Sequence, residues 1–227
     1  MVDAPMGDRP CSPPMVAPED APGVQGRETV GAVEPLRKKS EIERIKRHLK
    51  SRSLRDYALF VLGINTGLRV GDLLALTVGD VLEGTGRRLR VGVRLVIREQ
   101  KTRKIKRIIL NDTARRALNE YLKSRERRFP EDPLFLSRQR NGKDGSLRAL
   151  SRKQVWKVLS DAARACHVGD TIGTHTMRKT FGYYRYKTGH PLEEIQKMLN
   201  HSSPAITLIY IGITQDQMDQ SYRDVQL

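Results

Sequence analysis

Two short stretches of the sequence hold polar side chains at spacings that could support chemistry on a phosphate group. In the stretch HTMRKTF, His175 and Arg178 stand three residues apart, so both would project from one side of a helix, free to meet a ligand. In the stretch LNHSSPAITLIY, Tyr210 follows His201 by nine residues. A histidine can accept a proton, an arginine can bind phosphate oxygens and a tyrosine can act as a nucleophile. Taken alone, each pair is more typical of a solvated surface or of core packing.

A third stretch, TGLRVGDLLALTVGDV, places Arg69 after the glycine that ends a predicted buried helix. Asp72 lies three residues further on, where its carboxylate could hold or orient the guanidinium. The alternative interpretation is that Arg69 caps the carbonyl groups of the preceding helix. This motif is therefore also unspecific by itself.

The spacing of apolar residues predicts a mainly α (α+β) domain with one small antiparallel β-sheet around these residues. Ser40 and Glu43 have the spacing of a capping box at the start of the first helix, and Ser53 and Gly67 bound the second. The expected helices cover residues 40–50, 53–67, 70–76, 111–128, 151–168, 174–188, 191–199 and 205–211, with a weak last helix at 215–225.

A β-hairpin is predicted in the middle of the chain. Apolar residues alternate with arginines from Leu89 to Ile97, which is the pattern of a half-buried strand. The turn EQKTRK, residues 99–104, then leads to a second strand at 106–110. The sequence therefore places several lysines at the tip of a hairpin.

Other prominent side chains have structural interpretations. Trp156 is predicted to belong to the core together with Val155 and Leu159. Cys11 and Cys166 lack metal-ligand spacing, so reduced thiols are expected rather than a disulfide or a zinc site. Contacts to a phosphate backbone are expected from arginine-rich clusters at residues 87–98, 125–128 and 152–157.

The charge of the chain indicates a nucleic-acid partner. Residues 1–35 contain seven of the eleven prolines and carry a net charge of −4, which predicts a disordered acidic leader. Because the whole chain carries +16, residues 36–227 carry +20, and such a charge attracts polyanions. Ribosome-associated and basic membrane-surface proteins share this trait. The sequence shows neither a bilayer-spanning apolar run nor a signal peptide, so a cytoplasmic protein is expected.

Together the three stretches resemble the tyrosine recombinase, or phage integrase, family in the order and spacing of its catalytic residues. The resemblance covers about residues 36–222 and identifies 36–227 as a helical catalytic domain of tyrosine-recombinase type. The lysine of the family is best matched by Lys101, with Lys104 and Lys106 close by. Asn200 stands where glycine is common, and asparagine is the usual substitute for glycine in a left-handed conformation. The catalytic residues implied by the resemblance are Arg69, Lys101, His175, Arg178, His201 and Tyr210, with Asp72 in support.

The resemblance implies cleavage and rejoining of DNA strands without a metal ion, ATP or another cofactor. Tyr210 would attack the phosphorus to form a covalent 3′-phosphotyrosine and release a 5′ hydroxyl, with His175 as the base. The other implied roles are phosphate binding by Arg69, Arg178 and His201 and protonation of the leaving oxygen by Lys101.

The leading hypothesis is a site-specific recombinase or integrase of a mobile element that acts on double-stranded DNA in the cytoplasm, associated with the nucleoid. A homo-oligomer, a tetramer, is expected because exchange between two duplexes needs four cleavages. The segment 215–225 lies where members of the family often dock onto a neighbouring protomer.

Members of the family usually carry a helical core-binding domain before the catalytic one. Residues 1–35 are too short and too rich in proline to be that domain, so we expect it to be absent. An accessory DNA-binding protein could replace it. The rival hypotheses are an accessory or regulatory DNA-binding protein without strand exchange, and an enzyme with type IB topoisomerase activity.

Overall fold

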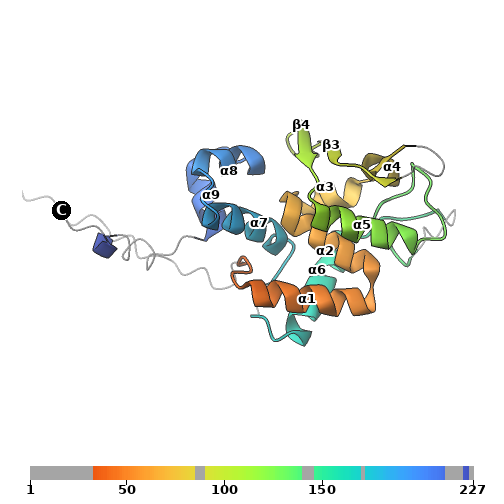
Figure 1. Cartoon of the computed structure of the whole chain (residues 1–227), viewed down its shortest axis with the longest axis horizontal. Coiled ribbons are helices and arrows are strands. Elements are labelled where there is room, and N and C mark those ends of the chain that lie inside the picture. Colours follow the sequence, from red (N-terminus) through yellow and green to blue (C-terminus); the bar gives the residue numbers. More distant parts are fainter. Residues whose placement is uncertain (1–32, 85–89, 140–145, 170–171, 213–221, 225–227) are drawn as a thin grey trace, which may run out of the picture. The chain divides into compact units, whose positions relative to one another are not determined.

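The fold is mainly helical, as the sequence predicts. The computed structural model describes residues 33–84, 90–139, 146–169, 172–212 and 222–224, all in the unit Gly31–Leu227 (Figure 1). The predicted leader, except for residues 33–35, and most of the predicted last helix lie outside these ranges. The helices are α1 Lys39–Arg52, α2 Leu54–Thr66, α3 Val70–Ala75, α4 Val78–Val81, α5 Asp112–Lys123, α6 Arg152–Ala165, α7 Thr176–Lys187, α8 Leu192–Leu199 and α9 Pro204–Ile211. The strands are β1 Leu82–Glu83, β2 Arg90–Val91, β3 Arg94–Arg98 and β4 Ile105–Ile109.

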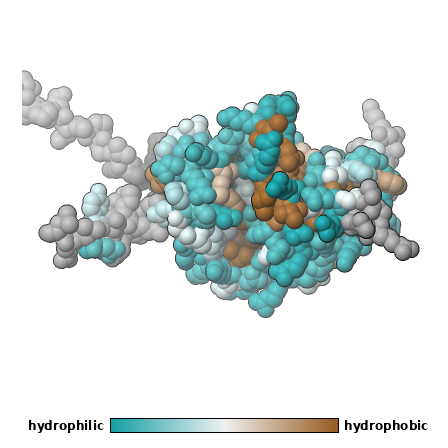
Figure 2. Space-filling model, turned by 45° about the horizontal axis from the view of Figure 1, so that its top comes forward, coloured by the Kyte–Doolittle hydropathy of each residue, from teal (hydrophilic) through white to brown (hydrophobic). Residues whose placement is uncertain are grey.

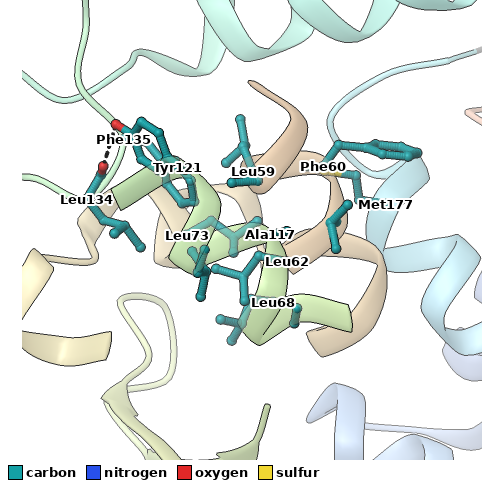
Figure 3. Close-up of a cluster of buried hydrophobic side chains, with 14 of the residues drawn as sticks. Leu59, Phe60, Leu62, Leu68, Leu73, Ala117, Tyr121, Leu134, Phe135 and Met177 are labelled. Carbon is teal, nitrogen blue, oxygen red and sulfur yellow. Dashed lines mark hydrogen bonds between the residues drawn. The ribbon is translucent and has the colours of Figure 1, made fainter. Parts of the chain in front are cut away.

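Helix α2 is the centre of the core, and α1, α5 and α7 pack around it. Five consecutive residues, 58–62, are at most 1% exposed, so the helix is buried on every side. This burial explains why its sequence is apolar all round. The Ser53 hydroxyl accepts the Asp56 N–H at its start, and Gly67 ends it with a left-handed φ of 62°. Figure 3 shows side chains of α2 interleaved with Leu73, Ala117 and Met177 from neighbouring helices. Both predicted ends of α2 are confirmed.

Two helix boundaries differ from the prediction. Helix α1 begins at Lys39, so Ser40 lies inside the first turn and the capping box expected with Glu43 is not formed. Helix α5 ends at Lys123 because Ser124 turns its hydroxyl back onto a carbonyl of the last turn. The basic residues 125–128, which were predicted to continue the helix, lie beyond it.

The structure contains two small antiparallel sheets among the described residues, where the sequence predicted one. Strand β1 pairs with β2 and β3 pairs with β4. The predicted strand from Leu89 to Ile97 is divided at Gly92, whose N–H bonds to the Val81 carbonyl instead of continuing the next ladder. A side chain at Gly92 would meet the Glu83 carboxylate at 2.4 Å, so the exposed Glu83 side chain would have to move to admit one.

The β3–β4 hairpin has one buried and one exposed face. Leu95 and Ile97 point into the core, whereas the alternate residues are exposed. Figure 2 shows a brown apolar stripe where Figure 1 places this hairpin, and its exposed apolar side chains are Val96, Ile105 and Ile109. The turn at the tip, residues 99–104, therefore extends from a strand whose inner face is fixed by the core.

Helices α7, α8 and α9 share a second apolar cluster. Its buried members are Phe181, Ile195, Leu199 and Ile211, and Tyr210 packs against it. The Ser203 hydroxyl caps α9 by accepting the Ile206 N–H, and Pro204 occupies the first turn, where its missing N–H costs nothing. This cluster holds the helix that carries Tyr210.

Candidate active site

One cavity of about 670 Å³ gathers the residues that the sequence singles out. Its wall comes from five separate parts of the chain: the start of α3, the β3–β4 turn, Arg152 at the start of α6, the start of α7, and the segment from the end of α8 into α9. The predicted residues that line it are Arg69, Asp72, Lys101, His175, Arg178, His201 and Tyr210. Folding thus brings all seven into one pocket.

Tyr210 and His175 meet in this cavity. The Tyr210 hydroxyl lies 3.1 Å from Nδ1 of His175, and the two rings stand edge to face with centroids 6.2 Å apart. Burial lowers the pKa of His175, and the charges of Arg178 and Lys179 lower it further. The imidazole is therefore mostly neutral at pH 7, and Nδ1 can accept the hydroxyl proton.

His201 contacts the same tyrosine ring, with centroids 4.4 Å apart. Its Nδ1 lies 3.0 Å from the hydroxyl of Thr207, a residue with no exposed surface. Burial, followed by the charges of nearby arginines and a lysine, lowers the pKa of His201 to about 4. The ring is thus neutral, and when Nδ1 accepts the Thr207 hydroxyl, Nε2 carries a proton.

Arg178 is buried, with 2% of its surface exposed. Nη1 donates to the Gly67 carbonyl at 2.5 Å and Nη2 donates to the Leu199 carbonyl, so the guanidinium joins the ends of α2 and α8. Burial and the charge of Arg69 lower the pKa of Arg178 to about 10, which leaves it protonated at pH 7. Two of its N–H groups are thus taken up by carbonyls, although Arg178 still lines the cavity, and the α2 capping considered for Arg69 is made by Arg178.

Arg69 forms an ion pair with Glu99, with 3.1 Å between Nη1 and Oε1. Asp72, which was expected to orient this guanidinium, instead accepts the backbone N–H of Gln100 at 2.9 Å. The short helix α3 therefore contacts the β3–β4 turn through two side chains. The carboxylate that holds Arg69 comes from the hairpin, not from the helix of Arg69 itself.

The three lysines of the hairpin occupy different positions. Lys101 lines the cavity, and its side chain is exposed. Lys104 is exposed and is not part of the cavity lining. Lys106 donates from Nζ to the Met198 carbonyl at 2.6 Å, and burial together with the charge of Arg178 lowers its pKa to about 8. Of these three, Lys101 has the placement expected of a proton donor to a bound phosphate ester.

Comparison with known proteins identifies the family. Residues 37–217 match the sequence profile of the phage integrase family. The chain belongs to this family. The Bacillus subtilis (strain 168) protein named "Probable integrase/recombinase YoeC" is 37% identical over 191 residues, which cover 84% of this chain and 96% of YoeC. The tyrosine recombinase XerD of Listeria monocytogenes serotype 4b is 29% identical over 175 residues, which cover 75% of this chain and 54% of XerD. The chain thus spans about half the length of XerD.

Solved structures show the same fold. The XerA recombinase superposes with a TM-score of 0.67 at 22% identity, covering 86% of this chain and 64% of XerA. The XerH recombinase in its post-cleavage complex with the difH substrate gives 0.62 at 20% identity, covering 83% of this chain and 52% of XerH. The described helices and hairpins therefore form the catalytic fold of a tyrosine recombinase.

Several polar residues of this recombinase fold escaped the sequence analysis. Glu99 is 1% exposed and forms an ion pair with Arg69. Its burial could have been predicted from the alternation of β3, because Leu95, Ile97 and Glu99 are spaced two residues apart and face the same side of the strand. A buried carboxylate needs a cation or several hydrogen-bond donors, so a glutamate on the buried side of the strand predicts such a partner. Nothing in the sequence distinguishes Thr207 from other hydroxyl residues.

One prediction about the core is wrong, and one basic cluster has acidic partners within the protein. Trp156 is 53% exposed, because the buried stripe of α6 runs through Val155 and Leu159 and the indole lies one residue off that stripe. In the basic cluster 125–128, Arg127 and Arg125 both form ion pairs with the buried Asp132. The charge of that cluster is therefore partly neutralised within the protein.

The described residues hold neither a metal cluster nor a membrane-spanning helix. Within the ranges given above, no group of three or more histidine, cysteine, aspartate or glutamate side chains is placed to hold a metal ion. In those same ranges no helix has both the length and the apolar character needed to cross a bilayer. Cys166 is a free thiol.

Proposed function

We propose that this chain cleaves and rejoins double-stranded DNA at a specific site through a covalent bond between Tyr210 and a 3′ phosphate. The observation that carries the proposal is the contact between the Tyr210 hydroxyl and His175, in a cavity that also holds Arg69 and Arg178. A phenol next to a neutral imidazole, facing two guanidinium groups, suits attack on a phosphodiester.

The first step is attack by the Tyr210 oxygen on phosphorus. The phenol proton passes to Nδ1 of His175, which is 3.1 Å away and mostly neutral because its pKa is lowered. The new bond joins the tyrosine oxygen to phosphorus, and the bond between phosphorus and the 5′ oxygen breaks. A phosphotyrosine preserves the energy of the phosphodiester, so rejoining needs no ATP.

The negative charge of the transition state falls on the non-bridging oxygens. Arg69 and Arg178 each supply N–H donors in a fixed plane. Arg178 uses two of its five N–H groups for carbonyls, and its buried Nε has no partner among the described atoms. His201, with Nδ1 occupied by Thr207, donates from Nε2 to a phosphate oxygen.

The leaving 5′ oxygen needs a proton. Lys101 lines the cavity from the hairpin tip and gives this proton as a general acid. When the 5′ hydroxyl of another strand enters, it returns its proton to the lysine and attacks phosphorus, His175 returns the proton to Tyr210, and a new strand is formed. Exchange between two duplexes requires four such cleavages, so we propose that a tetramer acts on DNA.

The proposed partner is double-stranded DNA of the nucleoid, in the cytoplasm. The net charge of +20 over residues 36–227 supports binding to the phosphate backbone, and the affinity should fall steeply with salt. The XerH relative is solved in complex with its difH substrate, and a λ integrase of the same fold with a core site. An accessory DNA-binding protein is proposed as a further partner.

A nicked suicide duplex tests the proposal. Such duplexes are tiled across the DNA that flanks the coding sequence. After cleavage the short fragment with the new 5′ hydroxyl dissociates, which traps the covalent adduct. We expect an adduct on a few duplexes with the wild-type chain and none with Tyr210→Phe, which removes only the hydroxyl. Adducts on every duplex, together with relaxation of supercoils, would indicate topoisomerase activity. Binding to a specific duplex without any adduct would indicate an accessory DNA-binding protein and would overturn the enzymatic proposal.

A further inference from the structure

Asn200 links two turns that are about a hundred residues apart in sequence. It ends α8 with φ 50° and ψ 49°, the left-handed conformation that glycine adopts without strain. Its side-chain amide donates to Oε2 of Glu99 at 2.6 Å and to the hydroxyl of Thr102 at 3.1 Å. The backbone at this position would accept glycine, so the asparagine side chain contributes something that the helix end does not require.

Both partners of Asn200 flank Lys101 on the hairpin tip. Glu99 precedes Lys101 by two residues and Thr102 follows it directly, and the Thr102 hydroxyl donates to Oε2 of Glu99 at 2.6 Å. Between them, the Gln100 N–H bonds to Asp72 at 2.9 Å. The backbone of Lys101 is therefore held on both sides.

The Lys101 side chain itself has no anchor. Within the described residues, its ammonium takes part in no hydrogen bond or ion pair, and the side chain is exposed. A long, unanchored lysine side chain samples many rotamers, so the position of its ammonium depends on where the turn is held. The side-chain contacts of Glu99 and Thr102 hold the turn together with the bond between Gln100 and Asp72.

The Glu99 carboxylate is the centre of this arrangement. Oε1 lies 3.1 Å from Arg69, while Oε2 accepts from Thr102 and Asn200. Burial alone would raise the pKa of Glu99, but the two hydrogen bonds and the charge of Arg69 outweigh it and lower the pKa. The carboxylate is thus ionised, and it joins the arginine of α3, the lysine turn and the turn before His201.

We propose that Asn200 is a positioning residue for Lys101: its amide fixes the β3–β4 turn against the end of α8, so that the Lys101 ammonium meets the leaving 5′ oxygen. This inference rests on the proposed function, in which Lys101 is the general acid. It assigns to Asn200 a contribution to protonation of the leaving group and none to attack by Tyr210.

A substrate that needs no general acid separates this contribution from a structural one. In a duplex whose scissile 5′ oxygen is replaced by sulfur, the P–S bond breaks and the thiolate leaves without a proton, because a thiol has a pKa of about 8.5, far below that of an alcohol. Tyr210 still forms its bond to phosphorus and still passes its proton to His175. Only the requirement for Lys101 disappears.

The variants are Asn200→Gly and Thr102→Val, compared with Lys101→Met in single-turnover cleavage of the oxygen and sulfur duplexes. Asn200→Gly keeps the left-handed backbone and removes the amide, and Thr102→Val removes a hydroxyl at nearly constant volume. We expect both to slow cleavage of the oxygen duplex by about tenfold, with near wild-type rates on the sulfur duplex. Lys101→Met should show the same selectivity with a larger loss.

A matched control is His167→Gly, since His167 is exposed and also has a φ of 50°. It introduces glycine at the same kind of backbone position and should leave both rates unchanged. Equal slowing of both duplexes by Asn200→Gly would overturn the inference, because it would place the effect at Arg178, which bonds to the neighbouring Leu199 carbonyl. Wild-type rates on both duplexes would overturn it as well. Failure of the wild-type chain to form any adduct would instead contradict the proposed function.

Discussion

The hydroxyl of Tyr210 lies 3.1 Å from Nδ1 of His175, although the two residues are 35 positions apart and come from different helices. His175 stands at the start of α7, where Thr176, Met177 and Arg178 are all buried. Tyr210 is in the last turn of α9, which packs against α7. The packing of these two helices thus sets the distance between the proposed nucleophile and its base.

The pH dependence of cleavage should report the lowered pKa of His175. Burial and nearby cations favour the neutral imidazole, so the group is ready to accept a proton at neutral pH and loses this ability only when pH falls through its lowered pKa. We expect the second-order rate constant for adduct formation, which reports the free enzyme, to fall towards acid pH with a midpoint below about 6.5, the ordinary value of histidine. A midpoint above that value would contradict this assignment. The decline should be absent from the residual activity of His175→Gln.

Thr207→Val should impair cleavage without weakening the fold. Valine has nearly the same shape as the buried threonine, but it cannot bond to Nδ1 of His201. The imidazole would then be free to place its proton on either nitrogen, and donation to the phosphate from Nε2 would be lost in part. We expect a loss of about threefold to tenfold in the single-turnover rate, and a free energy of unfolding within about 1 kcal/mol of wild type by urea titration. An unchanged rate would mean that this hydroxyl does not orient the ring.

The elements that position the site follow from local sequence signals. The starts of α2, α5 and α9 are marked in the sequence, because Ser53, Asn111 and Ser203 each accept an N–H of the first turn. The proposed catalytic residues lie at or near the ends of such elements, and their spacing within short motifs is visible in the sequence. Their gathering in one cavity could be inferred only from the resemblance to a family.

The contacts among the site residues could not be predicted in this way. The partner of Arg69 is Glu99, thirty residues away, whereas local spacing favoured Asp72. Arg178 looked like a surface residue because its neighbours are basic, yet its charge is taken up by two backbone carbonyls at helix ends. These ion-pair and hydrogen-bond partners depend on how helices and turns pack against each other. Neither the periodicity of the sequence nor the residue types predict that packing.

Glu99→Gln should lower stability in a pH-dependent manner. The pKa of Glu99 is lowered in the folded state, so its contribution to stability is present above the unfolded pKa, about 4.3, and is lost as pH falls through the lowered value. We expect the variant to lose about 2 kcal/mol in the free energy of unfolding at pH 7, and the difference from wild type to shrink below about pH 4. Urea unfolding at pH 7, 5 and 3.5 measures it. Glu193→Gln, which changes an exposed carboxylate on α8, is the control and should have little effect at any pH.

Deletion of residues 213–227 should lower assembly on DNA. In the family this segment often docks onto a neighbouring protomer, so its loss should reduce the complexes that hold two duplexes. The described residues that line the cavity all precede residue 213, and we therefore expect adduct formation on a single suicide duplex to persist. Sedimentation of the protein on a duplex site measures the first effect and a denaturing gel the second. Unchanged assembly would count against this role of the segment.

Gly67→Ala should damage both the fold and the site. Gly67 has a φ of 62°, which strains an L-residue, and a methyl group there would lie 2.5 Å from the Phe181 ring. Its carbonyl also accepts the bond from Arg178, so a shifted backbone would displace a proposed phosphate ligand. We expect a loss of about 2–4 kcal/mol in the free energy of unfolding and a cleavage rate lowered at least tenfold.

The control for Gly67→Ala is Gly189→Ala. Gly189 has a φ of 85°, but a methyl group there would meet no atom within 4 Å. The control therefore measures the backbone strain alone, about 1–2 kcal/mol, and its cleavage rate should match wild type. The excess destabilisation at position 67 then reports the clash with Phe181, and the loss of rate reports the displaced Arg178. If the two variants behaved alike in both measurements, the Gly67 carbonyl would have no part in placing the guanidinium.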